Sequence, residues 1–308
     1  AEQLGTGGVG VTTVRGPLAR DSLRLGVLRL PTDRARLAWL AAHLGDLPGS
    51  GIVYTLTVAA AEETAALLRE SGHEVRAYTG RLDDADRREA EEALRENRVK
   101  ALVATSALGM GFDKPDLGFV VHLGAPSSPV SYYQQVGRAG RAVEHADVLL
   151  LPGPEDIAIW QWFATSSRPR EDHAAAVLAA MADGRAWSVA RLETVADVRR
   201  SRLELLLKVL AVDGAVEREQ GGWRATGQPW VYDADRYARV TRTREAEQRA
   251  MNAYARPVDE ARCRMAVLQE SLDDPTAAPC GRCDVCAGPW YSTEVPAAAA
   301  EAASAVLD

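Results

Sequence analysis

Two arginines near the middle of the chain follow a helix-forming segment and stand among glycines. The stretch from Tyr132 to Arg141 reads YYQQVGRAGR and includes Arg138. A guanidinium stays charged and can bond two phosphate oxygens at once, and during phosphoryl transfer an inserted arginine neutralises charge developing on the γ-phosphate. The pattern therefore indicates phosphate-binding arginines at the end of a helix.

A second glycine-rich segment precedes these arginines. It runs from Ala104 to Asp116 and reads ATSALGMGFDKPD. Its glycines allow close approach of the backbone, and Asp113 can accept hydrogen bonds from a ribose or orient Arg141. Either segment alone is as well explained by a tight loop or a surface turn. Together, each after an apolar strand, the two segments favour a nucleotide-binding function.

The four cysteines lie late in the chain with the spacing C-x16-C-x2-C-x2-C. Four thiolates complete the tetrahedral shell of a structural zinc ion. A redox-active CxxC pair and an iron–sulfur cluster are the alternatives. The start shows no signal-peptide pattern, so the cluster is expected in a reducing compartment, which predicts a cytoplasmic, nucleoid-associated protein. The predicted ligands are Cys263, Cys280, Cys283 and Cys286.

Short apolar segments alternate with helix-forming segments through the first half of the chain. Such alternation predicts an α/β fold with a parallel sheet, whose functional loops follow the carboxyl ends of the strands. The predicted strands are 52–57, 75–78, 101–104, 119–123 and 148–151. The predicted helices are 32–44, 58–70, 83–96 and one that begins at 131.

The pattern changes to helices after Pro152. Within residues 187–226, two helices precede a hairpin that contains Trp223, which is the order of a winged helix. Residues 185–262 hold 15 Arg and Lys against 12 Asp and Glu, a charge of +3 in a chain of net charge −7. We expect DNA contacts from this region, with a helical spacer bearing solvated arginines as the alternative. The predicted DNA-binding residues are Arg199, Arg200, Arg202 and Arg224.

The paired glycine-rich segments resemble the fifth and sixth motifs of superfamily 2 helicases, in the form found in RecQ enzymes. The resemblance covers residues 23–163, with Gly51–Tyr54 similar to the fourth motif and Ala77–Leu82 to a further family element. The cysteine segment resembles the RecQ zinc element. One departure is Gln135, where the family usually has Glu.

The resemblance implies roles for single residues. Arg141 becomes the arginine finger with Arg138 as its catalytic partner. The residues implied at ATP are Gly111, Asp113 and Gln135. Thr55 and Thr105 are implied at the DNA backbone. The implied cofactors are structural Zn²⁺, and ATP with Mg²⁺ in the full-length enzyme.

The implied activity is ATP-driven 3′→5′ unwinding of DNA in repair or recombination, with single-stranded and duplex or junction DNA as partners and no membrane. The sequence contains no GxxxxGK[ST] segment. A first motor lobe is therefore expected elsewhere in the polypeptide, and the chain alone is expected to be inactive. A DNA-binding scaffold with a degenerate motor lobe and an RNA helicase are the rival functions.

The expected domains follow from these motifs. Here the winged-helix pattern precedes the cysteines, whereas the family usually has the opposite order. The expected divisions are a linker or artificial boundary at 1–25, a RecA-like motor lobe at 26–165, a winged-helix-like domain at 168–235, a helical zinc-binding element at 236–290, and a tail at 291–308 that leads into a missing region.

Overall fold

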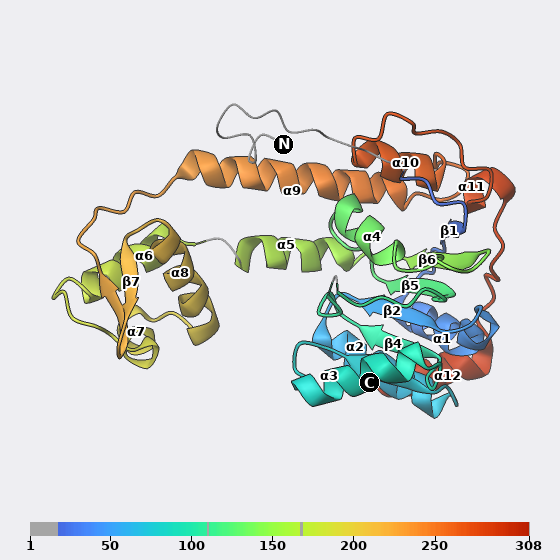
Figure 1. Ribbon diagram of the computed structural model, residues 1–308, viewed down its shortest axis with the longest axis horizontal. Helices are drawn as coiled ribbons and strands as arrows, with labels where there is room; N and C mark the ends of the chain where they lie inside the picture. The colour runs from blue at the N-terminus through green and yellow to red at the C-terminus, as the bar shows by residue number, and fades with distance from the viewer. Residues whose placement is uncertain (1–17, 110, 167–168, 308) are drawn as a thin grey trace. The chain divides into compact units, whose positions relative to one another are not determined.

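The computed structural model describes residues 18–109, 111–166 and 169–307 (Figure 1). The chain divides into two compact units. The first comprises Ala1–Asp156 together with Glu247–Asp308, and the second is Ile157–Ala246. Two of the expected boundaries differ from these limits. Residues from Ile157 group with the second unit, and the cysteine segment groups with the motor lobe because it packs on the sheet.

The first unit is built on a six-stranded sheet with the order β1-β6-β5-β2-β4-β3. Every pairing is parallel. Parallel strands need crossover connections and are buried on both faces inside a sheet, which explains the apolar sequences of the two inner strands β2 and β4. The α/β prediction is confirmed. The strands are β1 Leu23–Val27, β2 Gly51–Thr55, β3 Val75–Tyr78, β4 Ala101–Ala104, β5 Phe119–Leu123 and β6 Ala146–Leu151.

Four helices of this unit each begin after a residue whose side chain accepts a hydrogen bond from the first turn. The chain moves one way along the sheet after the first two helices and the other way after the last two. Right-handed crossovers therefore place the two pairs on opposite faces. The capping residues are Thr32, Thr57, Asp83 and Ser128. The helices are α1 Asp33–His43, continued by the 3-10 turn Leu44–Asp46, α2 Val58–Glu70, α3 Asp84–Arg95 and α4 Pro129–Val136.

Strand β1 lies partly in the segment expected to be a linker. It pairs with β6, and Leu23 and Leu25 are fully buried. The linker prediction is therefore wrong for residues 23–25, while residues 1–17 lie outside the described part. Strand β1 is short, contains an arginine and a glycine, and pairs with a strand distant in sequence, so its local signal is weak.

The C-terminal segment folds back onto the first unit. Helix α12, Ala297–Leu307, packs against α1 and α2, and Ala303 is fully buried there. The Trp39 Nε1 donates a hydrogen bond of 2.8 Å to the Ser292 carbonyl. Within the expected tail at 291–308, residues 297–307 thus form a helix docked on α1 and α2.

The second unit contains helices followed by a two-stranded hairpin. The side chains of Leu203, Leu206, Leu207 and Leu210 are buried and form the apolar face of α8. An isolated bridge joins Trp187 to Trp223. The elements are α5 Asp156–Ser166, α6 Glu171–Ala180, α7 Val189–Ala196, α8 Arg200–Val212, β7 Val216–Glu219 and β8 Gly222–Ala225.

Helix α9, Ala234–Tyr254, begins in the second unit and ends in the first. Two shorter helices, α10 Arg264–Ser271 and α11 Asp284–Ala287, follow it and contact β1. These contacts bring the cysteine segment to the edge strand of the sheet (Figure 1).

Candidate nucleotide, metal and nucleic-acid sites

Arg141 and Asp113 form an ion pair between the two glycine-rich segments. Arg141 Nη1 lies 2.7 Å from Asp113 Oδ1, and the two side chains are 41% and 56% exposed. An exposed ion pair contributes little stability, so Asp113 can orient the guanidinium and still release it to a phosphate. The structure thus brings Asp113 and Arg141 together, and the orienting role of Asp113 stays a prediction.

Arg138 is buried beneath the loop that follows β4. Its Nη1 donates to the Phe112 carbonyl at 3.0 Å, and its Nη2 donates to the Leu108 carbonyl at 3.3 Å. The residue is only 7% exposed. Arg138 therefore holds the loop that carries Asp113, and its role as the catalytic partner of Arg141 stays a prediction.

Gln135 bonds to a buried histidine. The Gln135 Oε1 lies 2.8 Å from His122 Nε2, and an amide oxygen only accepts, so this ring nitrogen carries the proton. Burial lowers the pKa of His122 to about 4, although the hydrogen bond to Gln135 favours the charged ring. His122 is consequently neutral at pH 7. The amide oxygen of Gln135 is thus bonded to His122, and the ATP contact expected of Gln135 stays a prediction.

The remaining motor-lobe candidates lie around the loops after β2 and β4. Gly111 is exposed, and a Cβ added there would meet nothing within 4 Å, so its backbone is open to a ligand. Thr55 is 5% exposed and donates to the Thr57 carbonyl, while Thr105 is 8% exposed and accepts from the Ala107 N–H. Both hydroxyls are engaged in local turns.

The four predicted cysteines meet at one point. Their sulfur atoms all lie within 4.8 Å of one another, and the Cys263 and Cys283 sulfurs are 4.0 Å apart. A tetrahedral ion with Zn–S bonds of ~2.3 Å places its sulfurs about 3.8 Å apart. The cluster therefore has the chemistry and the size of a closed four-thiolate metal site, completed by Cys280 and Cys286.

A fully buried ion pair beside the cysteines was missed by sequence reasoning. Arg264 Nε donates to Asp284 Oδ1 at 2.9 Å, and both side chains are 0% exposed. Asp284 Oδ2 also accepts from the Val27 N–H at 2.8 Å and from the Tyr291 hydroxyl at 3.0 Å. The cysteine cluster is thus tied to β1. The available signal was a charged residue directly after two of the cysteines.

The four arginines predicted to bind DNA differ in whether they form ion pairs. Arg199 and Arg202 are exposed at the start of α8, and their side chains form no ion pair among the described residues. Arg200 pairs with Glu204 at 3.0 Å, and Arg224 pairs with two glutamates of the hairpin. The structure therefore leaves two of the four predicted DNA-binding arginines available and pairs the other two.

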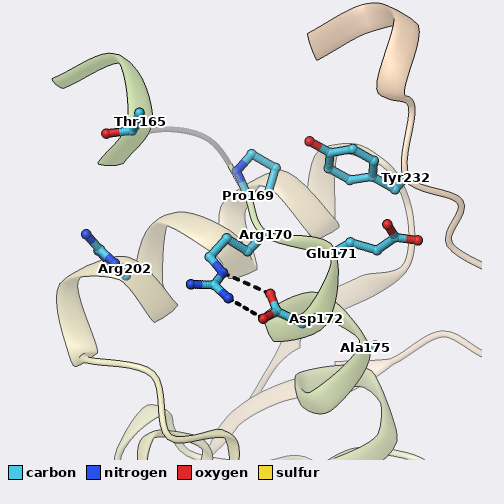
Figure 2. Close-up of a pocket in the computed structure, with 8 residues that line it drawn as sticks. All are labelled: Thr165, Pro169, Arg170, Glu171, Asp172, Ala175, Arg202 and Tyr232. Atoms are coloured by element: carbon cyan, nitrogen blue, oxygen red, sulfur yellow. Dashed lines mark hydrogen bonds and ion pairs between the residues drawn. The ribbon is translucent and has the colours of Figure 1, made fainter. Parts of the chain in front are cut away.

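An open depression of about 810 Å³ lies beside the start of α8. Figure 2 shows Arg202 on one side, Arg170 paired with Asp172 near the middle, and the Tyr232 ring on the other side. Arginine and aromatic side chains are the groups that contact phosphates and bases of nucleic acids.

Comparisons with known proteins agree with these motifs. Residues 36–143 match the family described as "Helicase conserved C-terminal domain". Over 115 residues the chain is 39% identical to the ATP-dependent DNA helicase RecQ of Pasteurella multocida, covering 37% of this chain and 18% of that protein. Over 122 residues it is 37% identical to RecQ of Bacillus subtilis, covering 40% and 21%. The matched segment thus spans about a fifth of these relatives.

Among solved structures, the chain is similar to the Escherichia coli DEAD-box protein SrmB, at 28% identity and a TM-score of 0.42, covering 46% of this chain and 84% of that one. None of the described helices is long and apolar enough to cross a membrane.

Proposed function

We propose that this chain, which contains a RecQ-type helicase C-terminal domain, supplies the second motor lobe and the DNA- and zinc-binding parts of an ATP-dependent 3′→5′ DNA helicase of repair or recombination. The observation that carries the proposal is the Arg141–Asp113 pair, which joins the two helicase motifs within the RecQ-like segment. An exposed arginine in a weak ion pair can leave its carboxylate and bind a phosphate, as an arginine finger must.

Arg141 supplies positive charge where negative charge grows on the transferred phosphoryl group. Asp113 keeps the guanidinium extended before ATP arrives, and Arg138 fixes the loop from which Asp113 projects. Gly111 lets the nucleotide approach the backbone. ATP and Mg²⁺ would be held by a lobe with a phosphate loop, which the 308 residues lack, so this chain alone hydrolyses no ATP.

The cysteine cluster holds Zn²⁺ in a structural role. Four sulfur ligands leave no open position for substrate, which distinguishes a structural site from a catalytic one. The buried Arg264–Asp284 pair, which bonds to β1, supports this role because it connects the cluster to the fold and not to the nucleotide loops.

The second unit binds duplex or junction DNA in the manner of a winged helix. Its element order, with α8 led by arginines and followed by a hairpin, supports this function. Arg199 and Arg202 carry the contacts to phosphates, because neither is neutralised by a partner among the described residues. Arg200 and Arg224 contribute less, since DNA must compete with their glutamates.

Unwinding assays with the whole protein test the function. The substrates are a DNA duplex with a 3′ tail, the same duplex with a 5′ tail, and an RNA duplex of equal length. We expect ATP-dependent separation of the 3′-tailed DNA alone, with a non-hydrolysable ATP analogue as the control. Equal unwinding of RNA would favour the RNA helicase, and DNA binding without unwinding would favour the scaffold.

A further inference from the structure

Residues 18–22, which precede β1, contact the glycine-rich turn that follows α4. Arg20 Nη1 donates to the Gly137 carbonyl at 2.7 Å and, more weakly, to the Ala139 carbonyl at 3.4 Å. Arg20 and Gly137 are 117 positions apart in the sequence, so the contact exists only in the folded lobe. We call residues 18–22 the clamp segment.

The Gly137 carbonyl also accepts a hydrogen bond from the proposed arginine finger. Arg141 Nε donates to it at 3.3 Å. A carbonyl oxygen has two lone pairs and can accept both donors. One oxygen atom thus connects Arg20 with Arg141, so a shift of this carbonyl on loss of Arg20 would change the hydrogen bond of Arg141 Nε.

Ser22 contacts the turn at the residue directly before Arg141. Its hydroxyl donates to the Gly140 carbonyl at 2.6 Å. Gly140 has a φ of +71°, and a Cβ added there would lie 2.5 Å from Ser22 Oγ. Glycine allows both this backbone conformation and so close an approach. The second glycine of the arginine motif therefore makes room for the clamp segment.

The clamp segment is bonded on its other side by the cysteine segment. Arg282, which lies between two of the cysteines, donates to the backbone carbonyl and to the carboxylate of Asp21. The Leu18 N–H donates to Asp274 Oδ2 at 3.1 Å. The clamp segment is thus fixed between the arginine turn and the cysteine segment, as a segment that positions another must be.

We propose that Arg20 and Ser22 are positioning residues for Arg141. By bonding the carbonyls of the turn, they set the place from which the Arg141 guanidinium extends. The proposal rests on the function proposed above, in which Arg141 acts on a phosphate. Such positioning matters because a misplacement of about 1 Å can cost ~10²-fold in rate.

The NMR signal of the Arg141 Nε–H in the 308-residue chain tests the contact directly. Arg20→Ala removes the donor that shares the Gly137 carbonyl, so we expect this signal to shift. The matched control is Arg29→Ala, which removes an arginine after the other end of β1 that also donates to a backbone carbonyl, that of Ala255 at 2.9 Å. An Arg141 signal that shifts equally in both variants, or in neither, would overturn the positioning role.

Ser22→Ala provides the second test, which remains valid if Arg20→Ala impairs folding. It removes only the hydroxyl that bonds the Gly140 carbonyl and keeps a small side chain before β1. We expect the Arg141 signal to shift in this variant by less than in Arg20→Ala. An unchanged signal would contradict the part proposed for Ser22.

ATP turnover by the whole protein separates positioning from a general effect on the fold. Arg20→Ala should lower kcat about 10-fold at unchanged KM for ATP, within the ~10²-fold loss expected when a catalytic group is misplaced. In the Arg141→Ala background the same change should lower kcat less than about 2-fold, because the effects of residues that act as a unit are not additive. An equal loss in both backgrounds would show that Arg20 acts independently of Arg141 and would overturn the proposal.

The positioning role and the proposed function fail in different ways. Near-normal turnover in Arg141→Ala contradicts the proposed function, whatever the NMR signals show. If Arg141→Ala lowers turnover and Arg20→Ala does not, the positioning role alone fails.

Discussion

Arg138 and Arg141 belong to the same short motif, yet burial gives them different parts. Arg141 is exposed and forms an ion pair with a single carboxylate. Arg138 is buried, and its Nη atoms donate hydrogen bonds to backbone carbonyls. The motif alone identified both as arginines of a phosphate site. It could not say which of them remains free, because that depends on the path of the loop above Arg138.

His122 provides a prediction at the same scale. Its pKa in the folded protein is about 4, below the ordinary 6.5, so between these values the unfolded chain binds a proton that the folded chain does not. Its burial therefore favours folding above pH 6.5, and this contribution of about 3 kcal/mol is lost as the pH falls to 4. NMR should show a neutral ring at pH 5.5, and a charged ring there would contradict the burial argument.

The pH dependence of wild-type stability does not isolate the contribution of His122, because Asp156 titrates in the same pH range. Burial raises the pKa of Asp156 to about 6, so its contribution changes in the opposite direction over the same range. The appropriate measurement is the difference in unfolding free energy between wild type and His122→Gln, which should grow from pH 4 to pH 6.5. A difference that is constant with pH would contradict the prediction.

At the scale of elements, β1 and the cysteine segment depend on each other. The Val27 N–H of β1 donates to Asp284, and the Tyr291 hydroxyl shares its single hydrogen between the Val27 carbonyl at 2.7 Å and Asp284 at 3.0 Å. Removing one partner of a buried ion pair costs about 3–5 kcal/mol of folding free energy. Loss of the Arg264–Asp284 pair should therefore destabilise β1, to which Asp284 is bonded. The cysteine element is thus part of the lobe's fold and not a separate appendage.

The zinc prediction follows from this dependence. The purified chain should contain one zinc ion and be colourless, and Cys283→Ser should lose the metal, because structural zinc binding is coupled to folding. Hydrogen exchange at Val27 should then accelerate, while the amides of β3, on the opposite edge of the sheet, serve as an internal control. Bound iron, or unchanged exchange at Val27 without metal, would contradict the assignment.

At the scale of the whole molecule, the features that could be predicted are those that depend on neighbouring residues in the sequence. The strands from β2 to β5 are short, mainly apolar segments bounded by helices or glycine-containing loops, and the cysteines have a recognisable spacing. The ring contacts that run from Tyr54 through His122 to Tyr132 and Tyr254 could not be predicted, because these residues are distant in sequence and meet only in the folded chain. Docking of α12 was missed for the same reason, since an alanine-rich helix does not indicate which face it covers.

DNA binding by the second unit is the prediction that concerns the whole molecule. In a titration of the whole chain, Arg199→Ala/Arg202→Ala should lower the slope of log affinity against log salt by about two units, at ~0.9 per phosphate contact. The matched control is Arg200→Ala/Arg224→Ala, which removes arginines already paired with glutamates and should change the slope less. Equal slopes for wild type and both double variants would show that α8 is a spacer.

The most direct test of the account is ATP turnover by the whole protein with Arg141→Ala. Because an arginine finger stabilises charge in the transition state, turnover should fall by ~10³-fold or more while ATP still binds. The control is Arg98→Ala, which removes another exposed arginine paired with a carboxylate, Glu96, and should leave turnover unchanged. Near-normal turnover in Arg141→Ala would contradict the assignment of this lobe as half of an ATP-hydrolysing site.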